Sequence, residues 1–341
     1  MQNPTPTRPD RPGRPPGRAP RRARRLGALA LVAALVAVAA ACGSDNSGDR
    51  SSAPTTAAGD PTATPDAPAT EQRVLALGEE RVLADLLALG ITPIASSANI
   101  VLDQGFVGID ADTTGIESFS STVENREALA DLHPDVVVVN EFTLEQLGRD
   151  YLDRLAAEEV VVVPETDAAE QVTVLGEAFG REDRAAELVA DLEEARDAGR
   201  EALADLPEAQ RRVSVLTVYS GPSLAAWVDG PVEVPATLQD LGFTLSPGPD
   251  DVKGATGGAT RGRAYLSEEM IGLFDAPTIV ALQSDQVDGE DEAWDAITAG
   301  PLWERLPAVA ADRVFTVDRL GYPGVVGHTR LVNDLVDLMG A

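Results

Sequence analysis

Apolar and polar residues alternate along the chain in blocks that predict strands and helices in turn. Residues 74–77 form a short continuous apolar run, typical of a buried strand, and the run ends at Gly78. From 79 to 89 apolar residues recur at helical spacing, and Gly90 is a typical helix stop. Similar blocks follow up to residue 163. We expect strands at 91–95, 136–139 and 160–163, and helices at about 125–132 and 143–157.

The second half of the chain repeats this alternation. Uninterrupted valine at 136–139 in the first half indicates parallel strands that are covered on both faces. Strands that alternate with helices indicate an α/β layer structure. In the second half we expect strands at 213–218, 278–282 and 313–317, and helices near 234–241, 267–274 and 325–339.

A long amphipathic stretch separates the two halves. Residues 181–206 carry apolar side chains on one side and acids with Arg on the other, which predicts one helix of roughly 39 Å. We therefore predict an N-terminal α/β lobe at 71–180, an inter-lobe helix at 181–206 and a C-terminal α/β lobe at 207–341. Both sheets are expected to be mainly parallel, with a ligand cleft between the lobes. The alternative is a single continuous doubly wound sheet with a long surface helix.

The N-terminus has the pattern of an export signal. Four Arg at positions 21–25 precede an apolar run at 26–41, which is shorter than the roughly 20 residues that span a membrane. Three Ala then lead into Cys42, the only Cys of the chain, and this junction resembles the lipobox of bacterial lipoproteins. The resemblance implies lipidation of Cys42 after removal of a signal peptide at 1–41. The alternative is an ordinary signal peptide cut near Ala41.

The rest of the chain is predicted to be a polar tether followed by an acidic body. Residues 43–70 are almost entirely Ser, Thr, Ala, Pro, Gly and Asp, without large apolar side chains, so 42–70 should be a disordered tether. The whole chain has a formal net charge of −29; the first 41 residues carry +7, which leaves −36 for the remainder. Such an acidic body would repel nucleic acid. We expect a body on the extracytoplasmic face of the cell membrane, held there by the lipid anchor.

Catalytic and metal-binding patterns are missing from the sequence. There is no G-x-S-x-G elbow, no phosphate loop and no H-E-x-x-H motif, so we do not expect an enzyme. A single Cys and two distant His also argue against a disulfide scaffold and against a Cys/His metal site. We expect neither a cofactor nor a metal ligand set.

Three motifs resemble those of one transport family. Residues 301–315 contain Pro-Leu-Trp followed by Leu-Pro-Ala-Val and Asp-Arg-Val-Phe, residues 125–135 contain Asn-Arg-Glu and Leu-His-Pro-Asp, and residues 266–269 read Leu-Ser-Glu-Glu. In their order along the chain, these three motifs resemble those of the siderophore-binding lipoproteins of ABC importers, whose two lobes are bridged by a rigid helix. The resemblance covers residues 73–340.

The resemblance implies how the protein meets its transporter. Glu127 and Glu269 match the family's two carboxylates, one per lobe, that form salt bridges to Arg residues of the ABC permease. The alternative for each is an acid at a helix start, where the helix dipole favours negative charge.

Basic residues gather in one predicted loop near the cleft. A ferric siderophore is bulky and often anionic, so its receptor needs cationic groups and aromatic faces. The Gly- and Thr-rich segment 251–264 contains Lys253, Arg261 and Arg263. By the resemblance, Arg261 falls where relatives contact the ligand, which makes it the first candidate.

Aromatic candidates come from three other loops. Tyr322 lies near the position of the family's cleft aromatic, and Trp227 and Phe142 follow predicted strands or turns. For Trp227 and Phe142 ordinary core packing is an equal alternative. Trp294 and Trp303 fit core packing better.

The expected function is a monomeric receptor that captures a ferric siderophore, passes it to an ABC permease and does no chemistry on it. Residues 119–122 lack the Arg that some relatives have there, which favours hydroxamate or mixed-ligand complexes over a triply charged catecholate. A cobalamin or haem receptor of the same fold is one alternative, with Tyr322 and His328 as the pairing that could hold haem. The other is a surface adhesion or sensory lipoprotein that works without a transporter.

Overall fold

The computed structural model describes residues 72–340 except 101–104, 123–125, 166, 221–222, 231–232, 257–258 and 261. The predicted signal peptide, the tether and Cys42 lie outside the described residues, as does Arg261. Within the described ranges, no helix has both the length and the apolar character that a membrane span requires.

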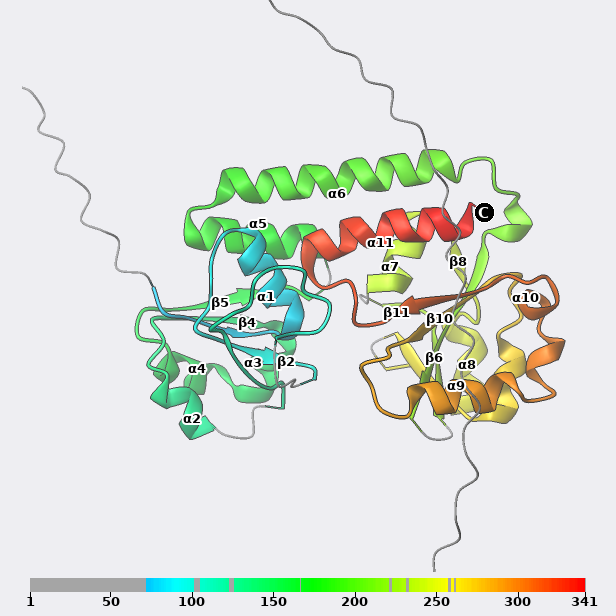
Figure 1. Ribbon diagram of the computed structural model, residues 1–341, viewed down its shortest axis with the longest axis horizontal. Coiled ribbons are helices and arrows are strands. Elements are labelled where there is room, and N and C mark those ends of the chain that lie inside the picture. Colours follow the sequence, from blue (N-terminus) through cyan, green and yellow to red (C-terminus); the bar gives the residue numbers. More distant parts are fainter. Residues whose placement is uncertain are drawn as a thin grey trace, which may run out of the picture. The chain divides into compact units, whose positions relative to one another are not determined.

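The first half forms a five-stranded parallel sheet, here called the N-terminal sheet, with strand order β3-β2-β1-β4-β5. All four valines at 136–139 are buried, as expected for a strand covered on both faces. Figure 1 shows the helices of this half on the two sides of the sheet. The strands are β1 (Val74–Leu77), β2 (Ala95–Ala98), β3 (Glu117–Ser120), β4 (Val136–Asn140) and β5 (Glu159–Val163).

The strand predicted at 91–95 is wrong, because β2 begins only at Ala95. Pro93 has no N–H to donate to a strand ladder, and the chain joins the sheet one residue later, where Ile94 donates to the carbonyl of Val74 at 2.8 Å. Strand β3 was not predicted, since its exposed and half-buried pattern lacks a continuous apolar run.

The helices of this half are α1 (Glu79–Ala88), α2 (Arg126–Asp131), α3 (Glu141–Leu147), α4 (Arg149–Leu155) and α5 (Ala168–Phe179). The single helix predicted over 143–157 is wrong. Gly148 has φ 81°, a left-handed conformation that ends α3 and starts α4 in a new direction. Helix α5, which was not predicted, begins where Asp167 accepts a hydrogen bond from the N–H of Ala169 at 2.8 Å.

The second half forms a separate six-stranded sheet, here called the C-terminal sheet. Five of its strands lie in the order β11-β10-β6-β7-β9, and β8 pairs with β6. Strands β6, β8, β10 and β11 pair in parallel, whereas β7 pairs antiparallel with both β6 and β9. Two sheets confirm the predicted two-lobed α/β fold over the single continuous sheet. The strands are β6 (Arg212–Tyr219), β7 (Ser223–Trp227), β8 (Thr244–Leu245), β9 (Arg263–Leu266), β10 (Ile279–Gln283) and β11 (Val314–Asp318).

Short helices connect these strands. The segment predicted as a helix at 267–274 is a 3-10 helix, η2, and α8, α9 and α10 were not predicted. Trp303 is buried and meets Trp294 edge to face with centroids 5.2 Å apart, in agreement with core packing. The helices are η1 (Glu208–Gln210), α7 (Glu233–Asp240), α8 (Pro249–Thr256), η2 (Glu268–Leu273), α9 (Glu290–Thr298), η3 (Trp303–Arg305), α10 (Pro307–Ala310) and α11 (Gly324–Met339).

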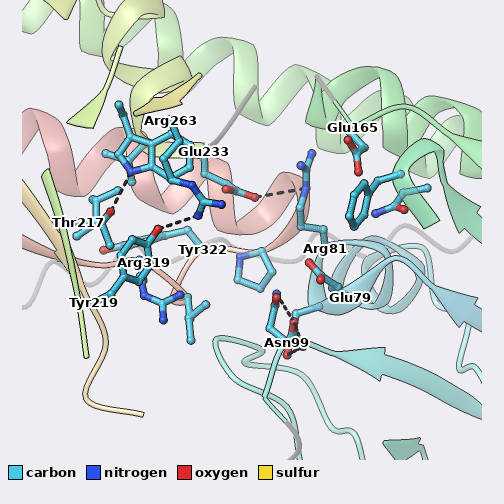
Figure 2. A pocket seen from close by; sticks show the side chains of 18 residues that line it. Glu79, Arg81, Asn99, Glu165, Thr217, Tyr219, Glu233, Arg263, Arg319 and Tyr322 are labelled. Atoms are coloured by element: carbon cyan, nitrogen blue, oxygen red, sulfur yellow. Dashed lines mark hydrogen bonds and ion pairs between the residues drawn. The ribbon is translucent and has the colours of Figure 1, made fainter. Parts of the chain in front are cut away.

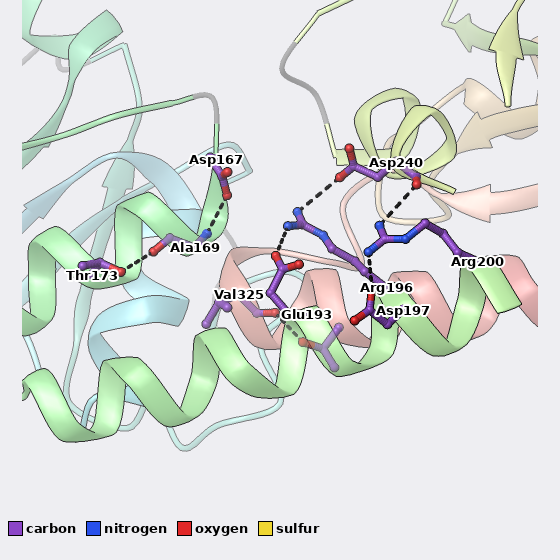
Figure 3. Close-up of polar contacts among 10 residues, drawn as sticks. Asp167, Ala169, Thr173, Glu193, Arg196, Asp197, Arg200, Asp240 and Val325 are labelled. Atoms are coloured by element: carbon purple, nitrogen blue, oxygen red, sulfur yellow. Dashed lines mark hydrogen bonds and ion pairs between the residues drawn. The ribbon is translucent and has the colours of Figure 1, made fainter. Parts of the chain in front are cut away.

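The long helix α6 (Glu182–Ala202) connects the two sheets along the chain. It packs against α5 near one end and against α11 along the rest, and Figure 1 shows both helices on the same side of α6. A Cβ on Gly199 would lie 2.8 Å from Leu241, so glycine permits this close approach. Arg196 of α6 pairs with Glu193 at 2.6 Å and with Asp240 of α7 at 3.4 Å (Figure 3). Helix α6 therefore contacts elements of both halves.

The start of α11 is bonded to α1. Asp85 of α1 is fully buried, and its Oδ1 accepts the N–H of Val325 at 2.7 Å. Its other oxygen accepts from Gln171 of α5 at 2.5 Å. Gly324 is left-handed, and a Cβ there would lie 2.5 Å from the Asp85 carboxylate. This contact places the start of α11 next to α1, the helix that follows the central strand β1.

Candidate functional site

A cavity of about 390 Å³ lies where chain segments from both sheets meet (Figure 2). In the N-terminal sheet the chain goes from β1 outward to β2 and β3 and then returns to place β4 on the other side of β1. The carboxyl ends of β1 and β4 therefore form a topological switch point, the usual ligand position in parallel sheets. Glu79 and Phe142, which follow these two strands, both line the cavity.

The side of the cavity formed by the N-terminal sheet carries carboxylates and amides. Glu80 is 5% exposed and accepts hydrogen bonds from the backbone N–H and from Nδ2 of Asn99 at 3.1 and 3.0 Å. Burial raises the pKa of Glu80. Glu79 has φ 60°, which is uncommon for a residue with a side chain, and burial followed by the neighbouring Glu80 raises its pKa.

The side formed by the C-terminal sheet carries a guanidinium among aromatic rings. The Arg263 Cζ lies 4.9 Å from the ring centre of Tyr265, 5.4 Å from that of Trp227 and 5.8 Å from that of Tyr219. Arg263 also donates to the Tyr219 hydroxyl at 2.7 Å, and Trp227 Nε1 donates to Thr217 Oγ1 at 2.9 Å. These are cation–π contacts with added hydrogen bonds, which hold the guanidinium in one orientation.

A second guanidinium, Arg319, comes from the segment after β11. Arg319 Nη2 and Nε donate to Glu290 Oε1 at 2.6 and 3.0 Å, and the Glu290 side chain is 1% exposed. Glu290 Oε2 accepts the N–H of Ser284 at 2.9 Å, so each carboxylate oxygen has a donor. The buried pair positions Arg319 at 6.0 Å from the Tyr219 ring.

Tyr322 lies in the loop before α11 and also lines the cavity. Its hydroxyl donates to Asp334 Oδ2 at 2.8 Å, and Arg330 Cζ lies 5.3 Å from its ring centre. Burial, followed by Asp334, raises the pKa of Tyr322 to about 12. The Tyr322 hydroxyl therefore stays protonated at physiological pH.

One ion pair crosses the cavity between the two halves. Arg81 Nε of α1 lies 3.4 Å from Glu233 Oε1 of α7. His328 of α11 is buried near this pair; its Nε2 has no hydrogen-bond partner among the described residues, and burial lowers its pKa to about 4. His328 is therefore neutral at physiological pH and does not line the cavity.

The candidate ligand residues differ in where the structure places them. Arg263, Tyr322, Trp227 and Phe142 all line the cavity. Phe142 is 40% exposed, so it is not a core residue, whereas Trp227 is 8% exposed and belongs to both the core and the cavity wall. Lys253 is exposed on α8 and pairs with Asp250 away from the cavity.

Other lining residues were missed. Glu79, Asn99, Tyr219 and Arg319 also line the cavity. Glu79 could have been found from its position after the first buried strand, and Tyr219 from its position at the end of the strand predicted at 213–218. The pattern around Arg319 has no such signal.

The two docking candidates are exposed. Glu127 lies in the first turn of α2 and Glu269 in the 3-10 helix η2. A hydrogen bond from the Ser267 hydroxyl lowers the pKa of Glu269, which is therefore ionised. Because η2 is a short 3-10 helix, an α-helix dipole explains Glu269 less well than it explains Glu127.

Comparison with known proteins gives consistent similarities. A family model described as periplasmic binding protein matches residues 75–319. The probable siderophore-binding lipoprotein YfiY of Bacillus subtilis (strain 168) is 27% identical over 286 residues, covering 79% of this chain and 82% of that protein.

Solved structures with the same fold are also similar. Staphylococcus aureus SirA complexed with staphyloferrin B has a TM-score of 0.65 at 20% identity, covering 78% of this chain and 92% of SirA. FhuD2 from Staphylococcus aureus with bound ferrioxamine B has a TM-score of 0.60 at 19% identity, covering 79% of this chain and 98% of FhuD2.

Proposed function

Because the chain belongs to the periplasmic binding protein family, we propose that it is an extracytoplasmic lipoprotein that captures a ferric siderophore and delivers it to an ABC importer. It works as a monomer, is anchored through a lipid on Cys42 and docks on the permease through Glu127 and Glu269. It binds its ligand without changing it chemically, and members of this family are substrate-binding proteins rather than enzymes.

The Arg263 cluster is the observation that carries the proposal. Three aromatic rings and a hydrogen bond hold one guanidinium at the wall of a cavity large enough for a small metal complex. Guanidinium groups bind the oxygens of iron chelators, and aromatic faces pack against their organic parts. The names of the similar proteins, which include a siderophore-binding lipoprotein and complexes with staphyloferrin B and ferrioxamine B, support the same ligand class.

A haem ligand has less support from the described residues. Tyr322 uses its hydroxyl to donate to Asp334, and His328 is 7% exposed and does not line the cavity. Neither side chain is placed to supply an axial ligand, so a ferric siderophore fits the wall better than haem.

The test is a calorimetric titration of the protein with ferric hydroxamates, ferric catecholates, ferric citrate, haem and cobalamin. We expect saturable submicromolar binding of one ferric siderophore class, and at least about tenfold weaker binding after Arg263→Ala, because the guanidinium and its ring contacts are lost. Arg184→Ala, which removes an exposed guanidinium of α6, is the matched control and should bind like the wild type. Binding of haem or cobalamin alone would contradict the proposed ligand class.

Docking is tested separately from binding. The double variant Glu127→Ala with Glu269→Ala should bind the ferric complex normally and lose its uptake into cells, because both exposed carboxylates lie outside the cavity. Glu187→Ala with Glu292→Ala, two exposed acids elsewhere, is the control. Intact uptake in the first double variant would favour a surface adhesion or sensory lipoprotein instead.

A further inference from the structure

The charges of the described residues that line the cavity do not suit a multiply anionic ligand. Among the described lining residues there are four carboxylates and three guanidiniums, so the wall has a formal charge of −1 when all are ionised. A trianionic complex would meet no net positive field there. The carboxylates are Glu79, Glu80, Glu165 and Glu233, and the guanidiniums are Arg81, Arg263 and Arg319.

Two of the three guanidiniums already have carboxylate partners. Arg319 is held by Glu290 through two short hydrogen bonds, and Arg81 lies 3.4 Å from Glu233. Arg263 instead contacts aromatic rings and the Tyr219 hydroxyl. The positive charge that the described wall offers a ligand is thus concentrated at Arg263.

Glu79 is held in a conformation that ordinary side chains avoid. Its φ of 60° lies in the left-handed region, at the first residue of α1. The Ser97 Oγ accepts its N–H at 3.0 Å, which keeps the backbone in this position. Residues held in a left-handed backbone conformation cluster at ligand-binding and switch sites, and the side chain of Glu79 lines the cavity.

Glu79 and Arg263 lie on different walls. Figure 2 shows Glu79 beside Asn99 on the α1 side, and Arg263 beside Tyr219 on the other side. The cavity therefore presents an anionic wall and a cationic aromatic wall to one ligand.

We infer that Glu79 is a specificity residue that binds a protonated amine of the ligand, so that the cavity selects ferric complexes carrying an ammonium group over trianionic catecholate complexes. The iron centre and its oxygen ligands then lie toward Arg263. The inference rests on the proposed function and names the ligand class of the same site.

The energetic reason is the state of Glu79 without ligand. Burial and the adjacent Glu80 disfavour its ionised form, although Asn99 and Ser121 donate hydrogen bonds to it. An ammonium group close by stabilises the carboxylate, and a charge-assisted bond to a partly buried carboxylate is stronger than one at the surface.

The experiment compares two ligands that differ in one charge. Ferrioxamine B carries a free ammonium group, and its N-acetylated derivative has the same ferric hydroxamate centre without that charge. The full chain in detergent micelles is titrated with both by calorimetry. We expect the wild type to bind ferrioxamine B at least about tenfold more tightly than the acetylated derivative. Glu79→Gln should bind ferrioxamine B and its acetylated derivative with about equal affinity.

Two controls keep the result interpretable. Glu79→Gly removes the carboxylate and relieves the left-handed strain, so it should lose the preference while melting at a higher temperature than the wild type. Glu292→Gln changes an exposed acid on α9 and should keep the preference.

Each outcome bears on the inference. An unchanged preference in both Glu79 variants, or tighter binding of a ferric triscatecholate than of ferrioxamine B by the wild type, overturns the role of Glu79 and leaves the proposed function standing. If no ferric complex of any class binds, the proposed function itself fails and the inference fails with it.

Discussion

The N-terminal sheet lines the cavity almost entirely with residues that follow its strands, whereas the C-terminal sheet also contributes residues that lie on its strands. Glu79, Asn99 and Phe142 come after β1, β2 and β4. Tyr219 and Trp227 are the last residues of β6 and β7. The two sheets therefore position their side chains by different means.

This difference explains the chemistry of each wall. Antiparallel pairing puts Trp227 directly opposite Arg263 across β7 and β9, so the cation–π contact is set by strand register. The N-terminal wall instead depends on turns, where Glu79 adopts its left-handed conformation and Asn140 starts α3. Side chains on paired strands are held more rigidly than side chains in turns. Two predictions test this contrast, and a third tests the contact between α1 and α11 that joins the two halves.

The largest effect is expected from Gly262→Ala, which breaks the C-terminal wall. Gly262 has φ 77°, and a Cβ there would lie 1.7 Å from the carbonyl oxygen of Asp229. The backbone before β9 has to move, which displaces Arg263. We expect ligand binding to be lost and the free energy of unfolding, measured by urea denaturation, to fall by about 3 kcal/mol.

Gly115→Ala is the matched control for this variant. Gly115 has φ 85°, but no described atom beyond its chain neighbours lies within 4 Å of the added Cβ. Gly115→Ala should lower the free energy of unfolding by about 1 kcal/mol and leave ligand binding unchanged. Equal effects of the two variants would show that the close approach at Gly262 is unimportant.

A smaller effect is expected from Asn140→Ala in the N-terminal wall. The Asn140 Oδ1 accepts the N–H of Thr143 at 2.8 Å and caps α3. We expect the free energy of unfolding to fall by about 1 kcal/mol, with Arg263 and its contacts unchanged. Asn140→Asp keeps the acceptor oxygen, so its free energy of unfolding should stay close to that of the wild type. A loss of ligand binding as large as that of Gly262→Ala would argue against the contrast between the walls.

The smallest effect is a pH dependence at the contact between α1 and α11. Burial raises the pKa of Asp85 from 3.8 to about 6, so the folded state binds more protons than the unfolded state between these values, and stability falls as pH rises through them. Burial lowers the pKa of His328 from 6.5 to about 4, so its contribution rises with pH over nearly the same window. The two contributions oppose each other.

Removing one group should uncover the other. In Asp85→Asn the free energy of unfolding should rise more steeply between about pH 4 and pH 6.5 than in the wild type, and in His328→Gln it should rise less or fall. Urea denaturation at a series of pH values measures both slopes. Identical slopes in all three proteins would mean that neither group titrates differently on folding.

Two of the strands whose predicted bounds agree best with the structure, β1 and β4, are continuous buried runs. Residues 74–77 and 136–139 are apolar throughout because both faces of a central parallel strand are covered. Edge strand β3 and the antiparallel strand β9 carry mixed patterns, which single-sequence reasoning does not distinguish from loops. The break at Gly148 was also missed, because the apolar spacing continues across it.

The same limit applies to the site. Arg263, Trp227, Tyr322 and Phe142 were identified by residue type and by resemblance to a family, and all line the cavity. Glu79 and Arg319 were not, because their roles depend on a left-handed backbone and on a buried partner, Glu290, that is distant in sequence. The position of Glu79 after the first buried strand marks it only as a residue near the cavity, and the local pattern around Arg319 carries no signal at all.

The sequence by itself determined the alternation of strands and helices, the long helix between two α/β halves and the family to which the chain belongs, because apolar periodicity and local motifs record which residues are buried. Only the tertiary structure decided that a carboxylate wall from one sheet lies across a cavity from a guanidinium among three rings. That arrangement depends on strand order, on strand register and on the hydrogen bond of Asp85 to α11, all of which join residues that are distant in the sequence.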